Sequence, residues 1–223
     1  MIWEWNYAFE TVPVLLEGLG MTVYITVVAA ALALIFGFML ALVRVQKVPL
    51  LSQMASLYIQ LIRNTPLLVQ VYLFFFALPE FGFTISPLWS AIVVLGMQTS
   101  AYLSEIYRAG IQSVPQEQWD ACTALNLPRW RVWTRVVLPQ SLVPIMPAIG
   151  NHINSLLKLT SYAAAIGVIE LFGQGLRVAE YTYKYLVPLT LVGFIYLLIS
   201  ITLTVLIRRL EIRNDRRSLQ RIV

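Results

Sequence analysis

The chain has 223 residues, of which 59% are hydrophobic and only 12% charged, with a formal net charge of +5. Soluble domains carry about 25% charged residues, so this composition excludes an ordinary soluble protein. A single cysteine excludes an internal disulfide framework, and a single histidine excludes a metal site of the usual Cys/His spacing. No glycine is followed by lysine, which excludes a phosphate-binding loop of the P-loop type.

Uncharged runs along the chain predict membrane-spanning helices, which need about 20 apolar residues each. Four runs are long enough: Gly18–Val43, Phe81–Ser104, Val136–Leu157 and Tyr185–Ile207. A shorter run, Pro66–Pro79, becomes a span only if its helix begins near Ser56. Because lipid cannot satisfy an open backbone, we predict an all-α, polytopic membrane protein with five transmembrane helices.

Two stretches outside these runs are too polar or too short to span. Residues 1–17 are predicted to form a short external segment or interfacial helix, with Trp3, Trp5 and Tyr7 suited to the membrane interface. Residues 159–184 contain an uncharged run too short for a span, which predicts a re-entrant or external helix packed on protein. No linker or repeat divides the chain, so residues 1–223 are predicted to be one domain.

The basic residues predict the orientation. Residues 1–17 carry three glutamates and no lysine or arginine, whereas 13 of the 16 basic residues lie in the C-terminal tail and in two of the inter-span loops. The positive-inside rule therefore predicts an external N-terminus and a cytoplasmic C-terminus. The basic tail is interpreted as an anchor near anionic lipid, not as a nucleic-acid site.

A polar segment, Gln116–Pro139, lies between predicted spans three and four. Ser113 and Pro115 are typical of a helix start, and Trp119, Cys122 and Leu125 then share one helix face. Asn126 suits a left-handed helix cap. The predicted helix, Gln116–Leu125, is too short to be stable alone, so packing must hold it. We predict a cytoplasmic docking helix within a loop of about residues 111–135.

This loop resembles the EAA loop of binding-protein-dependent ABC importer permeases. Asp120, Ala121 and Cys122 match its E-A-A, Asn126 its glycine and Pro139 its proline, with two changes of identity. Further segments resemble the polar amino acid uptake subfamily: RNTPLLVQ at Arg63–Gln70, AYLSEIYRAGIQSVP at Ala101–Pro115 and LPQSL at Leu138–Leu142.

The resemblance implies a permease of the bacterial inner membrane that moves its substrate by alternating access. It also implies a second permease subunit, two cytoplasmic ATPase subunits that hold ATP and magnesium, and an external solute-binding protein; no cofactor is expected on this chain itself. The residues implied in ATPase coupling are Trp119, Asp120, Ala121, Cys122, Leu125 and Asn126. The alternatives are that Asp120 is a solvated charge and that Trp119 packs on its own spans.

Polar side chains recur at helical spacing inside two predicted spans. They are Gln98, Tyr102 and Glu105 in the third, and Asn151, Asn154, Ser155 and Lys158 in the fourth. Such groups are costly in a membrane and often line a substrate path. Glu105 would then meet an ammonium group, and Lys158 with the amides a carboxylate. The alternatives are an ion pair between Glu105 and Arg108, and hydrogen bonds between helices. His152 is interpreted as a structural donor.

Similar permeases often read K-D-T-S where this chain has Lys158, Leu159, Thr160 and Ser161. Leucine in place of the acid favours a heterodimer in which the other permease holds most of the substrate site. The expected substrate is a polar amino acid or similar zwitterion. FFFALPEFG and TALNLPRW also resemble permeases for compatible solutes such as ectoine. From other classes, a passive channel or scaffold does not account for the loop, and an intramembrane enzyme lacks its catalytic pairs.

Overall fold

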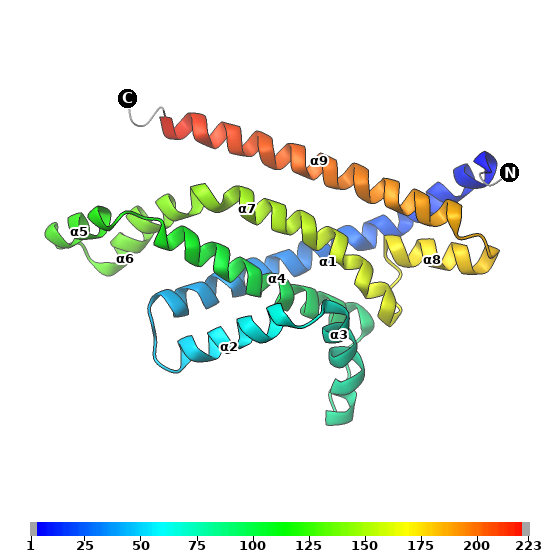
Figure 1. Ribbon diagram of the computed structural model, residues 1–223, viewed down its shortest axis with the longest axis horizontal. Coiled ribbons are helices and arrows are strands. Elements are labelled where there is room, and N and C mark those ends of the chain that lie inside the picture. The colour runs from blue at the N-terminus through cyan, green and yellow to red at the C-terminus, as the bar shows by residue number, and fades with distance from the viewer. Residues whose placement is uncertain (1–3, 220–223) are drawn as a thin grey trace.

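The computed structural model describes the backbone of residues 4–219 and the side chains of residues 4–209. Trp3 and the side chains of the basic residues beyond Arg209 lie outside the described residues. Every regular element of the described chain is a helix (Figure 1). In order they are α1 (Trp5–Val45), α2 (Leu51–Asn64), α3 (Leu67–Tyr72), η1 (Leu73–Ala77), η2 (Leu78–Phe81), α4 (Pro87–Gln112), α5 (Gln116–Ala124), α6 (Arg129–Arg131), η3 (Val132–Val137), α7 (Leu138–Leu159), η4 (Thr160–Ile166), α8 (Leu171–Thr182) and α9 (Leu186–Leu219).

The N-terminal helix α1 is a single element of 41 residues. The prediction of a separate segment over residues 1–17 is wrong for the described part, because the helix continues through Pro13 into the apolar run without a break. A continuous helix satisfies the hydrogen bonds of each backbone N–H and C=O group within its own segment, as an apolar environment requires.

Within the described residues, three helices are long and apolar enough to cross a membrane: Trp5–Val45, Arg129–Ile166 and Leu186–Arg209. A fourth arises only if Leu51–Asn64 and Leu67–Phe81, which meet at 109°, count as one span. Predicted span two is therefore not one straight helix. Thr65 is extended (φ −110°, ψ 141°) because the following Pro66 disfavours helical backbone before it. Predicted span three corresponds to α4. This helix is not one of the three span candidates, because polar residues occupy its second half.

Small residues let the central helices approach closely. A β-carbon placed on Gly37 of α1 would lie 2.9 Å from the carbonyl oxygen of Ser100 on α4. One placed on Gly110 of α4 would lie 2.7 Å from the carbonyl oxygen of Ser141 on α7. Neither site has room for a side chain, so α1, α4 and α7 pack backbone to backbone, as is common in membrane helices.

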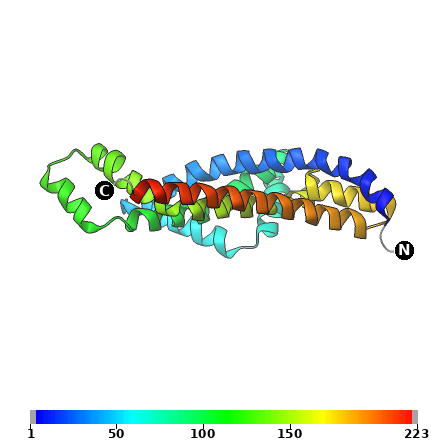
Figure 2. The same cartoon turned by 90° about the horizontal axis from the view of Figure 1, so that it is seen from above.

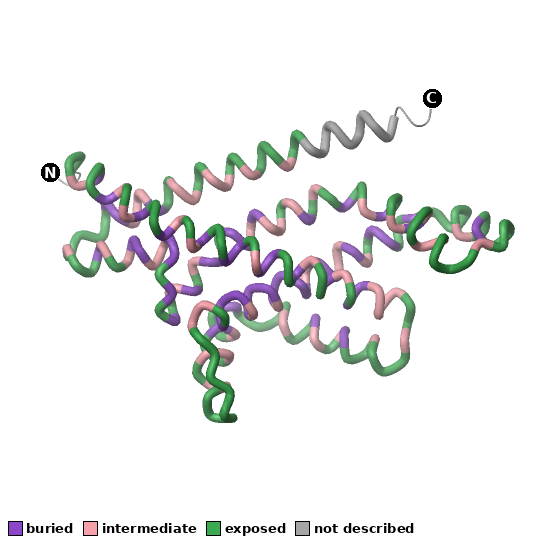
Figure 3. The backbone as a smooth tube through the Cα atoms, turned by 180° about the vertical axis from the view of Figure 1, so that it is seen from behind, coloured by how far each residue is buried: buried purple, intermediate pink, exposed green. Residues whose placement is uncertain are grey.

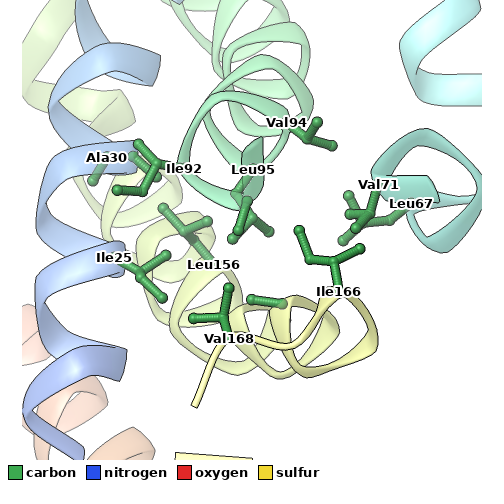
Figure 4. Packing of buried hydrophobic residues seen from close by; sticks show 13 residues of the cluster. Ile25, Ala30, Leu67, Val71, Ile92, Val94, Leu95, Leu156, Ile166 and Val168 are labelled. Carbon is green, nitrogen blue, oxygen red and sulfur yellow. The ribbon is translucent and has the colours of Figure 1, made fainter. Parts of the chain in front are cut away.

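The main hydrophobic core lies where these helices meet the short ones. Ile25 of α1, Leu95 of α4 and Leu156 of α7 are fully buried there, together with Val71 of α3, and Ile166 of η4 closes the cluster (Figure 4). In contrast, the tube coloured by burial shows that α9 keeps most of its described length exposed or half-buried (Figure 3). An apolar helix with so little protein contact is suited to lipid.

The segment after α7 forms a packed helix, as predicted for residues 159–184. The chain continues from α7 through η4 and then turns into α8, which packs against α1 and α9. The molecule is elongated. α8 and the start of α1 lie at one end, called the α8 end, and α5 and α6 lie at the opposite end (Figures 1 and 2).

Candidate functional site

The predicted docking helix begins directly after a proline. α5 starts at Gln116 with Pro115 in the N-cap position, and no side chain caps it. Ser113, predicted to cap this helix, instead ends α4, where its hydroxyl donates to the carbonyl oxygen of Gly110 at 2.8 Å. The start was therefore predicted within a few residues, but the capping role of Ser113 was wrong.

An apolar seat fixes α5 to the rest of the protein. Cys122 is buried and Trp119 half-buried, and both face inward. The ring of Trp119 meets the ring of Trp133 edge to face, with centroids 5.7 Å apart. Leu125 was predicted on the same face but is 71% exposed. The helix ends at Ala124, so the chain has already left the helical path at Leu125.

The C-terminal end of α5 is closed by a complete Schellman motif. Asn126 is left-handed, with φ of +50°, which confirms the prediction from its side chain. Its amide donates to the carbonyl of Thr123 at 2.9 Å, and the amide of Leu127 donates to the carbonyl of Cys122 at 3.1 Å. Two end carbonyls are thereby satisfied, and the direction of the following chain is fixed.

The other faces of α5 remain open. Asp120 and Ala121 are exposed. Among the described side chains, the Asp120 carboxylate accepts a hydrogen bond only from the side-chain amide of Gln116, at 3.0 Å. A cavity of about 650 Å³ lies between α5 and the turn that follows it, lined in part by Asn126 and Trp130. A seated, capped helix with polar open faces can serve as a rigid contact for another protein.

A second candidate site is a polar pocket of about 350 Å³ between α1, α2 and α4, defined here as the polar pocket. Sites for small molecules usually measure about 300–1,000 Å³. Its lining residues are Arg44, Ser56, Ile59, Gln60, Arg63, Asn64, Tyr102 and Glu105. The pocket brings together two of the predicted path residues, Tyr102 and Glu105, with groups of α1 and α2 that were not predicted to take part.

Glu105 is not a free carboxylate. It accepts hydrogen bonds from Arg44 of α1, and from Arg108 at 2.7 and 3.0 Å. The ion pair between Glu105 and Arg108, which was the alternative interpretation, is therefore present, and Arg44 is a second partner of Glu105. Two positive charges on one carboxylate leave it little capacity for a substrate ammonium group.

Tyr102 connects the polar pocket to α7. The guanidinium of Arg63 lies over the Tyr102 ring, 5.0 Å from its centroid, and the centroid of the His152 ring also lies 5.0 Å from that of Tyr102. Gln98, four residues earlier on α4, is buried, and its side-chain oxygen has no hydrogen-bond partner among the described residues. The predicted stripe on α4 thus reaches from a buried amide to an ion-paired carboxylate.

The predicted stripe on α7 divides between two surroundings. Asn154 is buried, and its amide donates to the carbonyl oxygen of Ser200 at 3.3 Å and the hydroxyl of Thr204 at 3.1 Å, both on α9. It therefore makes the hydrogen bonds between helices that were the alternative interpretation. Asn151 and Lys158 are exposed and remain available to a substrate path.

Sequence reasoning missed Glu170, whose side chain is fully buried. Its carboxylate caps α8 by accepting from the amides of Phe172 and Gly173 at 3.0 and 2.8 Å. It also accepts from the hydroxyls of Thr22 on α1, at 3.1 Å, and Tyr196 on α9, at 2.8 Å. The only sequence signal was one acid at the end of an uncharged run, directly before a glycine-containing helix.

Comparison with known proteins decides the family. Residues 33–216 match the model of the binding-protein-dependent transport system inner membrane component. The chain belongs to this family. It is a permease subunit of an importer and a multi-pass protein of the inner membrane.

Relatives and solved structures agree with this assignment. The probable amino-acid ABC transporter permease y4tG of Sinorhizobium fredii is 33% identical over 96% of this chain and 93% of its own length. The glutamine permease GlnP of Escherichia coli is 33% identical over 96% and 98%, and the arginine permease ArtQ of Bacillus subtilis 35% over 93% and 95%. A crystal structure of an amino acid ABC transporter with histidines superposes with a TM-score of 0.89 at 31% identity, over 96% of this chain and all of the other.

Proposed function

We propose that this permease imports an amino acid or a similar zwitterion, driven by ATP that is hydrolysed on separate subunits. The proposed coupling to the ATPase is supported by the way in which α5 is held. The helix is anchored by Trp119 and Cys122, ended by Asn126, and open at Asp120. Such a helix moves as a rigid body with an ATPase that holds it, and transmits that movement to α4 and α7.

The amino-acid part is supported by relatives with glutamine and arginine as named substrates, and by a pocket of suitable volume that is lined by polar and charged groups. We further propose that the active assembly contains two permease subunits, two ATPase subunits and an external solute-binding protein, with the N-terminus of this chain outside.

A heterodimer of permeases is favoured over a homodimer. Leu159 is half-buried and packs against the main hydrophobic core, so it cannot present a charge to the path. With Glu105 occupied by two arginines, this chain offers no free carboxylate in its polar pocket. A different partner permease that carries an acid at the equivalent place would supply the missing half of a zwitterion site.

The test is uptake into proteoliposomes that contain the permease pair and its ATPase, with the binding protein added outside. We expect ATP-dependent accumulation of at least one radiolabelled amino acid. Accumulation of ectoine but no amino acid would shift the substrate to compatible solutes. Equilibration without ATP would instead indicate a passive channel and contradict the proposal.

A further inference from the structure

The polar pocket has more positive than negative charge. Arg44 and Arg63 line it with one acid, Glu105, and Arg108 lies directly beside that acid. Among the described lining residues, Glu105 is the only carboxylate. Both Arg44 and Arg108 pair with it, so its negative charge is more than balanced before any substrate arrives.

Arg63 is the cation that remains available. It makes no ion pair within the described side chains, 4–209. Its guanidinium stacks over the ring of Tyr102, with its carbon 5.0 Å from the ring centroid. Stacking fixes the plane of a guanidinium but leaves its N–H groups at the edge, where they match both oxygens of a carboxylate. Arg63 is therefore held in position for an anionic group.

A further positive charge lies outside the polar pocket, on α7, which packs against α4. Lys158 on α7 is exposed and also makes no ion pair among the described side chains. The next residue, Leu159, is apolar and packs on the core. A second positive charge on a substrate would meet repulsion in the polar pocket, where Arg44, Arg63 and Arg108 outnumber Glu105.

We propose that this subunit selects an anionic, dicarboxylic amino acid over a cationic one, with Arg63 binding the side-chain carboxylate of the substrate. The inference rests on the proposed function, since it names the substrate class of the same pocket. It also reverses the expected polarity of the stripe on α4, where Glu105 was predicted to receive an ammonium group.

The test measures binding of tritiated L-glutamate to the purified permease–ATPase complex, without the binding protein, by scintillation proximity. Glutamine and arginine serve as competitors. We expect glutamate to compete best and arginine least. Arg63→Gln should weaken glutamate affinity about tenfold, the loss expected for one charged hydrogen bond, without weakening arginine.

The matched control is Arg177→Gln, which removes an exposed positive charge from α8, outside the polar pocket. It should leave all three affinities unchanged. Absence of glutamate binding, equal competition by arginine, or equal behaviour of Arg63→Gln and Arg177→Gln would each overturn the charge selection.

Uptake assays on the same preparation separate the two proposals. ATP-dependent uptake that prefers arginine would contradict the charge selection and leave the importer function intact. If no amino acid is taken up, the proposed amino-acid import fails, and the charge selection fails with it.

Discussion

The rings of Trp119 and Trp133 meet at an interplanar angle of 80°, and they join α5 to η3, which leads into α7. The contact closes a loop in the chain, because the Schellman turn at Asn126 lies between the two tryptophans. α5 is thereby attached to both α4, which precedes it, and α7, which follows.

Trp133→Ala should loosen this attachment. An aromatic pair contributes about 0.5–1.5 kcal/mol beyond the area that it buries. We expect normal expression, but a reduced stimulation of the ATPase by substrate-loaded binding protein. Trp130→Ala is the matched control, since Trp130 is 59% exposed and, among the described side chains, its ring stacks with the guanidinium of Arg131 and not with another ring. Equal effects of the two variants would show that the pair does not transmit coupling.

Asn126→Gly should be tolerated, whereas Asn126→Val should not. Left-handed backbone costs an ordinary residue about 1–2 kcal/mol, and more when the side chain is β-branched. Valine would change the direction of the backbone at Leu127 and in the turn that follows. Substrate-stimulated ATPase rates of the two variants, compared at equal protein levels, provide the measurement. Valine equal to or better than glycine would refute the role of the left-handed cap.

Glu105→Gln should destabilise the protein. The substitution leaves Arg44 and Arg108 beside a neutral amide, in a site where all three side chains are between a fifth and a third exposed. We expect a loss of about 1–3 kcal/mol in stability, measured as a lower Tm in detergent. The double variant with Arg44→Gln should lose less than the sum of the single variants. An unchanged Tm together with lost uptake would assign Glu105 to substrate instead.

Asp120→Lys should weaken binding of the ATPase to the permease without unfolding the permease. Asp120 is exposed, so its reversal affects a partner surface more than the core. The measurement is the amount of ATPase that co-purifies, with Tm as the check on folding. Gln118→Lys is the control, because Gln118 contacts Gln140 at the start of α7 and lies on another side of the helix. Normal co-purification would make Asp120 a solvated charge.

Cysteine labelling tests the orientation of α1. Asn6 and Gln46 are both exposed and lie near opposite ends of this helix, and the buried Cys122 can be replaced by serine. An impermeant thiol reagent should label Asn6→Cys in intact cells and Gln46→Cys only after lysis. The opposite pattern would place the N-terminus inside and remove the docking helix from the cytoplasm.

Features set by neighbouring residues were predictable from sequence. Asn126 is left-handed because its own side chain tolerates that backbone, and the run-length rule located α1, α7 and α9. The break between α2 and α3 also had a local signal, Pro66, but the length of the apolar run outweighed it in the prediction.

Features set by distant partners were not predictable. Glu105 and Arg44 are separated by 61 residues, and nothing near Glu105 indicates that α1 delivers a second arginine. Similarly, the stripe on α7 gave no sign that Asn154 is buried and donates to α9 whereas Asn151 is exposed. Helical spacing shows which residues share a face, but the packing of whole helices decides what each face meets.

The buried Glu170 also constrains how the protein is made. Its hydrogen-bond donors include Thr22 from the first helix and Tyr196 from the last. The carboxylate therefore has all of these donors only after α9 has been synthesised. Until then, α8 carries a charge with incomplete hydrogen bonding beside the bilayer, which is costly. The last helix therefore completes the assembly of the α8 end, and a chain truncated before Tyr196 should leave that end a substrate for quality-control proteases.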